Sequence, residues 1–341
     1  LSLKTLSWSS VDVDPNGSKL YFDLLGDLYQ MPIEGGNAVS IRSGLSFDSQ
    51  PAISPDGNWL AYISDADGND NLWIMKLDDP SIRKRLSDES YNILISPSWS
   101  PDGKTILVTR RSKDVELLLY HVDGGDGLVL KGANSEALEG VGGVYSKDGK
   151  FIYYSAETES RGPVSNFPRT QVFRMNLVSG AIEQITQGEG GGVKPRISPD
   201  GSLLVYGTRF EARTGLRVRN LNTGVDRWLT YGIQRDTQEN HRPSSGGLLP
   251  GYNFSPDGKE IFLVADGTFR RISLSNGSIN DLPFEANITI AIGPELNQSW
   301  RVSEGPVTAT LAQDPTWSPQ NDRIAASIFT RIYIKSRGQL A

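Results

Sequence analysis

Short runs of alternating apolar and polar residues recur along the chain, and a common turn phrase precedes each run. The phrase is an apolar residue, then Ser or Asp, then in most copies Pro-Asp-Gly. Its copies stand at 13–17, 53–57, 99–103, 145–149, 197–201, 254–258 and, in degraded form, 317–321. Pro presets φ for a type I turn, Asp bonds the backbone just ahead of it, and Gly accepts a left-handed conformation. In the last copy Asn321 takes the Gly position, which Asn tolerates better than most residues.

Apolar residues follow each turn at every second position. The first such position holds Leu20, Leu60, Ile106, Ile152, Leu204, Ile261 and Ile324. The next holds Phe22, Tyr62, Val108, Tyr154, Tyr206, Leu263 and Ala326. A period of two, rich in β-branched and aromatic residues, predicts a strand, so each turn joins the two strands of a hairpin.

Two further apolar stretches follow each complete hairpin. The third strands are predicted at 27–33, 71–77, 116–122, 171–177, 215–221, 267–274 and 330–336. Shorter fourth strands are predicted to end near Ile41, Leu86, Ile185 and Leu229, while 128–133 and 279–284 fit the pattern less cleanly. Four antiparallel strands per repeat, repeated radially, form a β-propeller.

The repeat count predicts an all-β chain, with residues 1–341 forming a single seven-bladed propeller domain. The seventh repeat stops after its third strand, and Leu1–Ser7 resembles a spare fourth strand. We therefore expect residues 1–7 to complete blade seven and so to remove an exposed sheet edge. The turns grow further apart along the chain, which places long loops at 157–168, 188–193 and 234–249.

Composition narrows the function classes. The formal charge of −6 argues against a nucleic-acid partner, and the apolar runs are too short to span a membrane. The basic residues Lys104, Arg110, Arg111 and Lys113 are interpreted as a solvated strand end. The chain has no cysteine, which fits a periplasmic or extracellular location.

The best metal candidate is the acidic stretch at 65–71, in which Asp65, Asp67 and Asn69 offer oxygen ligands at alternate positions, as Ca²⁺ requires. Its Gly comes too early for a calcium loop, and Lys76 stands where a bidentate Glu is needed. We therefore predict a polar hairpin tip and no cofactor, with Ca²⁺ as the alternative.

No catalytic residue is assigned, because the chain has no Gly-x-Ser-x-Gly motif and only two histidines. His121 is predicted to be a packed or edge residue of a strand. Asn240, His241 and Arg242 lie in the long loop at 234–249 and are the candidate binding residues. The glycine-rich stretch at 188–192 lacks the context of a phosphate loop and is expected to be a flexible connection between blades.

The repeat resembles the TolB-type propellers built from PD40 repeats. Longer phrases, among them FDLLGDLY at 22–29 and GLLPGY at 247–252, resemble the N-terminal propeller of bacterial amidohydrolases that carry a TolB-like domain. The hydrolase barrel and its His-x-His motif are not in this chain, so the resemblance implies no hydrolytic residue here.

The resemblance implies a non-catalytic binding or substrate-gating domain of an amidohydrolase-like system, whose partner is another protein or an adjoining hydrolase domain. Two alternatives stay open. One is a metal-dependent hydrolase or lyase with its site at the channel mouth, and the other is a periplasmic TolB-like envelope scaffold.

Overall fold

The computed structural model describes residues 2–112, 114–134, 138–158, 170–238, 247–289 and 304–338. In these ranges the chain forms strands, turns and loops, which confirms the all-β prediction. No helix long and apolar enough to cross a membrane occurs in the part of the chain that the structure describes. The chain divides into unit 1, Leu1–Ala291, and unit 2, Ile292–Ala341.

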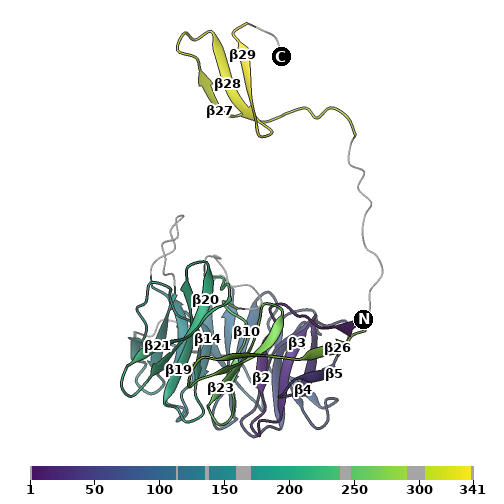
Figure 1. Cartoon of the computed structure of the whole chain (residues 1–341), viewed down its shortest axis with the longest axis vertical. Helices are drawn as coiled ribbons and strands as arrows, with labels where there is room; N and C mark the ends of the chain where they lie inside the picture. The colour runs from purple at the N-terminus through teal and green to yellow at the C-terminus, as the bar shows by residue number, and fades with distance from the viewer. Residues whose placement is uncertain are drawn as a thin grey trace. The chain divides into compact units, whose positions relative to one another are not determined.

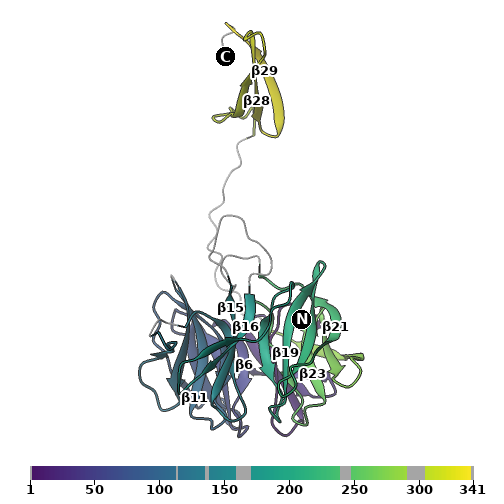
Figure 2. The ribbon, with the colours of Figure 1, turned by 90° about the vertical axis from the view of Figure 1, so that its left-hand side faces the viewer.

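In its described residues, unit 1 contains six sheets, here blades 1 to 6, each built on four successive antiparallel strands, and the sheet of blade 1 gains two further strands (Figures 1 and 2). The innermost strands are β2 (Val11–Val13), β6 (Asp48–Ile53), β10 (Ile93–Trp99), β14 (Val141–Tyr145), β18 (Val193–Ile197) and β22 (Asn253–Phe254). The second strands are β3 (Lys19–Leu24), β7 (Trp59–Ser64), β11 (Thr105–Arg111), β15 (Phe151–Glu157), β19 (Leu203–Phe210) and β23 (Glu260–Ala265).

The two outer strands of each blade match the predicted third and fourth stretches. The third strands are β4 (Asp27–Pro32), β8 (Asn71–Lys76), β12 (Val115–His121), β16 (Thr170–Asn176), β20 (Arg213–Asn220) and β24 (Thr268–Ser273). The fourth strands are β5 (Gly36–Arg42), β9 (Arg83–Arg85), β13 (Leu128–Val129), β17 (Ile182–Gln184), β21 (Asp226–Gln234) and β25 (Ile279–Leu282).

The alternating positions predicted to be apolar form the core between blades. In unit 1 the first position after each turn is completely buried, and the second is at most 4 % exposed. Each turn is held by its own side chains: in blade 2, the Ser54 hydroxyl donates to Asp56 at 2.5 Å, and Asp56 accepts the Asn58 amide at 3.1 Å. These bonds to the charged form lower the pKa of the Asp56 carboxyl.

The six turns of unit 1 form a closed ring. The Pro of each turn lies against the Gly of the next: a methyl group added at Gly57 would lie 3.5 Å from Pro15, and one at Gly17 would lie 3.5 Å from Pro256. Blade 6 therefore contacts blade 1 directly. A seven-bladed ring is not confirmed, because the turns of six blades already close on one another.

The predicted closure by residues 1–7 is wrong in its partner. β1 (Ser2–Leu3) pairs with β26 (Phe284–Asn287), and β26 runs parallel to β5 at the outer edge of blade 1 (Figure 1). The chain leaving blade 6 thus clamps onto blade 1 and is covered by the chain start. The rings of Phe22, Phe269 and Phe284 meet at this junction, with centroids 4.7–5.7 Å apart.

Unit 2 carries the seventh turn phrase. Its sheet consists of β27 (Gln313–Trp317), β28 (Arg323–Ile328) and β29 (Arg331–Ser336). Asn321 adopts a left-handed φ of 55°, as predicted for a residue that replaces Gly.

Candidate functional site in the central channel

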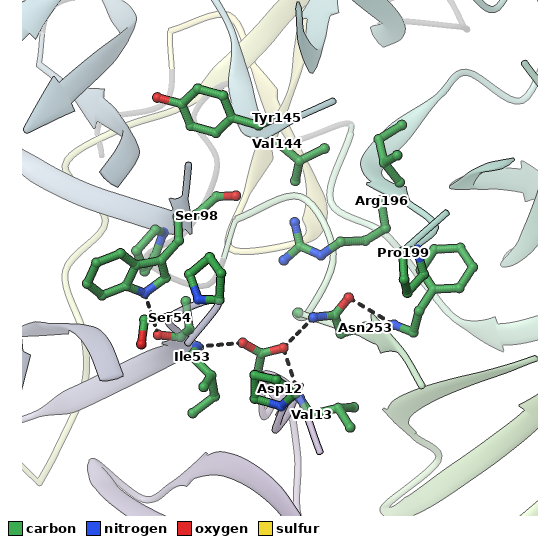
Figure 3. Close-up of a pocket in the computed structure, with 18 of the residues that line it drawn as sticks. Asp12, Val13, Ile53, Ser54, Ser98, Val144, Tyr145, Arg196, Pro199 and Asn253 are labelled. Atoms are coloured by element: carbon green, nitrogen blue, oxygen red, sulfur yellow. Dashed lines mark hydrogen bonds between the residues drawn. The ribbon is translucent and has the colours of Figure 1, made fainter. Parts of the chain in front are cut away.

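The inner strands of all six blades line a cavity of about 480 Å³ at the centre of unit 1. The prolines of the turns, Pro15, Pro55, Pro101, Pro199 and Pro256, surround one part of it, and Lys147 takes the Pro place in blade 4. The next-to-last residue of each inner strand lines the cavity; these residues are Asp12, Ala52, Ser98, Val144, Arg196 and Asn253. Figure 3 shows the Arg196 guanidinium pointing toward the centre, with Asp12 and Asn253 to one side.

A bulge interrupts the inner strand of four blades, where the pairing register shifts. At these bulges Gln50, Ser96 and Lys194 have φ values of 55°, 57° and 52°, and blade 4 has Gly142. A left-handed conformation costs a residue with a side chain about 1–2 kcal/mol. Strain of this kind is concentrated at functional sites, and here it turns three polar side chains toward one end of the cavity.

Side chains of neighbouring blades satisfy the amides of the bulges. Asp23 in blade 1 accepts the amides of Ser10 at 2.6 Å and Gln50 at 3.1 Å. The Gln50 side-chain oxygen accepts the Ser96 amide at 2.8 Å. These bonds join blades 1, 2 and 3 around the channel and hold the Asp23 carboxylate in place.

Asp12 is held almost as completely. Its carboxylate accepts the amides of Ile53 at 2.7 Å and Val13 at 2.9 Å, and also a hydrogen bond from the Asn253 side chain. Burial is the largest influence on the Asp12 carboxyl and raises its pKa, while these donors and the charge of Arg196 act in the opposite direction. Asp12 therefore has little acceptor capacity left for a ligand.

The cationic side chains of the channel have fewer hydrogen-bond partners than Asp12. Arg196 donates from Nε to the Tyr252 carbonyl at 2.8 Å, and no acceptor for its two Nη groups is found among the described residues. Lys194 reaches past Gly142 and donates from Nζ to the Ser96 hydroxyl at 3.0 Å. Burial and the neighbouring charge of Arg196 lower the pKa of Lys194 to about 7. Burial also raises the pKa of Asp23 to about 6.

The chain segment before blade 6 approaches the end of the channel where Lys194 lies. A methyl group at Gly247 would lie 3.5 Å from the Ser96 hydroxyl oxygen. Leu248 and Leu249 are buried, and the Tyr252 hydroxyl donates to the Lys194 carbonyl at 2.5 Å. Residues 247–249 of the predicted long loop therefore pack beside this end of the channel, whereas Asp236, at its start, is bound to Arg209 and Thr214.

The acidic stretch forms a hairpin tip between β7 and β8. Asp65 accepts the Phe47 amide at 2.6 Å, and Asp67 pairs with Arg85. No group of three or more His, Cys, Asp or Glu side chains that could hold a metal occurs in the described ranges. Calcium binding by Asp65, Asp67 and Asn69 stays a prediction.

The other predicted sites fall in two places. Asn240, His241 and Arg242 lie outside the described residues. His121 lies on the exposed end of β12, with Nδ1 3.5 Å from Asp123. The stretch at 188–192 does connect blades 4 and 5, but it is packed: Gly190 accepts the Arg209 amide at 2.9 Å, and a methyl group at Gly192 would lie 2.6 Å from the Thr186 hydroxyl.

Sequence reasoning missed the channel residues. The signal lay two residues before the Ser or Asp of each turn phrase. Blades 5, 6 and 1 carry Arg196, Asn253 and Asp12 there, whereas blades 2, 3 and 4 carry small or apolar residues. Aligning the repeats on their turns would have placed these three side chains on one ring.

Residues 9–165 match the family model for the TolB β-propeller domain, PD40. This part of the chain is similar in sequence to the TolB-type propellers. The match covers less than half of the chain, and the sheets of blades 1 to 3 lie within it.

Curated relatives agree with this assignment. An uncharacterized peptidase, YuxL of Bacillus subtilis, is 31 % identical over 50 % of this chain and 23 % of its own length. A TolB homologue of Chlorobaculum tepidum is 29 % identical over 29 % of this chain and 22 % of its own length. The chain therefore spans only a minor part of the curated relatives it matches.

Solved structures support the fold alone, because their identities are low. A putative TolB from Agrobacterium tumefaciens has a TM-score of 0.58 at 19 % identity, covering 73 % of this chain and 86 % of its own. The tricorn protease has a TM-score of 0.60 at 15 % identity, covering 98 % of this chain and 30 % of its own. An oligogalacturonate lyase in complex with manganese has a TM-score of 0.52 at 16 % identity, over 98 % and 91 % of the two chains.

Proposed function

We propose that unit 1 is a non-catalytic binding propeller that takes the carboxylate of a peptide or protein chain into its central channel. The open Nη groups of the Arg196 guanidinium carry this proposal. Guanidinium groups bind carboxylates in a two-pronged geometry, so a carboxylate could accept from both Nη groups of this half-buried side chain.

The charge distribution supports an anionic ligand. Lys147, Lys194 and Arg196 line the channel, and among the lining residues described only Asp12 is acidic. Asp12 is already occupied by three donors. The channel is therefore locally cationic in a chain whose formal charge is −6. The turn prolines and Trp99, Ile197 and Phe254 supply apolar surface for the rest of the ligand.

In the cell, we propose, this binding serves an amidohydrolase-like system in the periplasm, with the propeller delivering or admitting a chain end to a hydrolytic partner. The resemblance to propellers that precede hydrolase barrels and the similarity to a named peptidase support this role.

The test compares two peptides that differ only at the C-terminus, one with a free carboxylate and one amidated, by titration calorimetry. We expect the free acid to bind at least about tenfold more tightly, equivalent to about 1.4 kcal/mol. Arg196→Met removes this preference, whereas Lys131→Met, a matched change at an exposed lysine outside the channel, keeps it. Equal affinity for both peptides, or no effect of Arg196→Met, would refute the proposal.

A further inference from the structure

Three aromatic side chains gather at the outer part of blade 5. Phe210 ends β19, and Trp228 and Tyr231 lie on the edge strand β21. The ring centroids of Trp228 and Tyr231 are 4.5 Å apart, and Phe210 meets both rings at steep angles, 5.7 and 5.3 Å away. Phe210 is 47 % and Tyr231 55 % exposed. An exposed cluster of this size on a polar surface marks a binding site.

A groove of about 820 Å³ lies beside this cluster, between blades 4 and 5. Phe210 and Trp228 form one wall, and the glycine-rich segment 188–190 forms the other. A methyl group at Gly188 would meet no atom within 4 Å, so the backbone is directly accessible there. Figure 1 shows β19, β20 and β21 together on one side of the ring.

The polar groups of the groove are balanced. Arg209, Arg217 and Arg219 line it together with Glu189, Glu211 and Asp226. Asp226 accepts hydrogen bonds from Arg217 Nε and from the Tyr206 hydroxyl, both at 2.6 Å. The Arg217 guanidinium also lies over the Trp228 ring, 5.0 Å from its centroid. The groove therefore offers fixed donors and acceptors without a net charge.

We propose that this groove binds a neutral oligosaccharide. Flat aromatic faces pack against the C–H faces of sugar rings, and sugar hydroxyls need donors and acceptors side by side. An apolar peptide would cover the Glu189 and Glu211 carboxylates of the groove without donating a hydrogen bond to either, which is unfavourable. The balanced charge disfavours a polyanion, in contrast to the cationic channel.

The site is independent of the proposed function. Its aromatic residues lie on the second and outer strands of blade 5, whereas the channel is lined by the inner strands. Loss of carboxylate binding in the channel would therefore leave glycan binding in the groove intact. Loss of glycan binding would likewise leave carboxylate binding intact.

The experiment measures binding of maltohexaose, cellohexaose and chitohexaose to the whole chain by titration calorimetry. At least one is expected to bind. Trp228→Ala is expected to weaken it at least about tenfold, because Trp228 forms a wall of the groove and packs against the exposed Phe210 ring, and stacking on one aromatic ring is worth about 1–3 kcal/mol for nucleic-acid bases. Tyr91→Ala, which removes an aromatic side chain 98 % exposed elsewhere, serves as the control and should bind normally.

Trp228 is half-buried, so its substitution could disturb folding, and Phe210→Ser provides a second variant at a more exposed position. Thermal unfolding shows whether both variants are folded. The proposal is overturned if none of the three sugars binds, or if binding survives both substitutions. It is also overturned if hexagalacturonate or a proline-rich decapeptide binds at Trp228 more tightly than every neutral sugar, because the ligand would then be an acidic glycan or a peptide.

Discussion

Pro256 of blade 6 lies against Gly17 of blade 1, and this contact closes the ring of turns. A methyl group at Gly17 would lie 3.5 Å from both Cγ and Cδ of Pro256. Gly17 also has a φ of 71°. A residue at this position must therefore adopt a left-handed backbone conformation while it contacts Pro256. The same pair, Pro of one turn and Gly of the next, recurs between the other blades except where Lys147 replaces Pro.

Gly17→Ala should therefore destabilise unit 1 by about 1–2 kcal/mol, because a β-carbon disfavours the left-handed conformation. Gly17→Asn should lose clearly less, since Asn321 adopts a φ of 55° at the same position of the seventh phrase. Urea unfolding of the two variants gives the comparison. Equal losses would show that crowding against Pro256, rather than backbone strain, sets the cost.

The Phe284 side chain packs β26 against blades 1 and 6, and this packing is the second contact that closes the ring of unit 1. Phe284→Ala should cost about 3–5 kcal/mol, as for other buried phenylalanines, because its ring packs on both Phe22 and Phe269. Phe47→Ala removes the same side chain at a position of unit 1 that is 54 % exposed, and it should cost clearly less. Chemical unfolding followed by tryptophan fluorescence measures both, and a small effect at Phe284 would mean that β26 contributes little to ring closure.

The strands and turns of each blade could be predicted from the sequence, because the residues that determine them lie within one repeat. Turn chemistry and the alternation at Leu20 and Phe22 are local, so reading them needs no knowledge of neighbours. The same locality explains the error in closure. A turn phrase predicts a hairpin, and the seventh phrase does form one in unit 2, whereas the turns of unit 1 are joined by contacts between its own six repeats.

The channel site was not predicted from the sequence, for a related reason. Lys194 and Asp23 come from blades 5 and 1, and only ring closure brings their charges together. Lys194 also reaches inward because a bulge gives it a φ of 52°, and no residue type at that point announces the bulge. Arg196 could have been recognised more easily from the sequence, since a charged residue there interrupts the apolar pattern of its strand.

Lys194 should make stability depend on pH in the alkaline range. Its pKa is lowered from 10.5 to about 7 in the folded chain, so between these values the unfolded chain holds more protons. Stability from this group therefore rises as pH increases from about 7 toward 10. The rise should be smaller in Lys194→Met than in the wild type or Lys131→Met, by urea unfolding at several pH values. Identical profiles would mean that folded Lys194 keeps its ordinary pKa.

Carboxylate binding in the channel should weaken as pH rises above about 7. Lys194 is charged below its pKa and neutral above it, and only the charged amine attracts an anion. The groups near it are Asp23, Arg196 and the Ser96 hydroxyl. Of these, Asp23, with a pKa of about 6, also titrates near neutral pH. It becomes more repulsive as it ionises, so both groups act in the same direction.

A bound carboxylate stabilises the lysine cation, so binding above about pH 7 should take up a proton. Calorimetry of the free-acid peptide in two buffers of different ionisation enthalpy measures that uptake directly. Lys194→Met should abolish the uptake above neutral pH while keeping part of the affinity through Arg196. Asp23→Asn should instead raise affinity and leave the uptake in place. A wild-type affinity that stays constant from about pH 6 to about pH 9 would exclude Lys194 from the binding site and would leave carboxylate binding to Arg196.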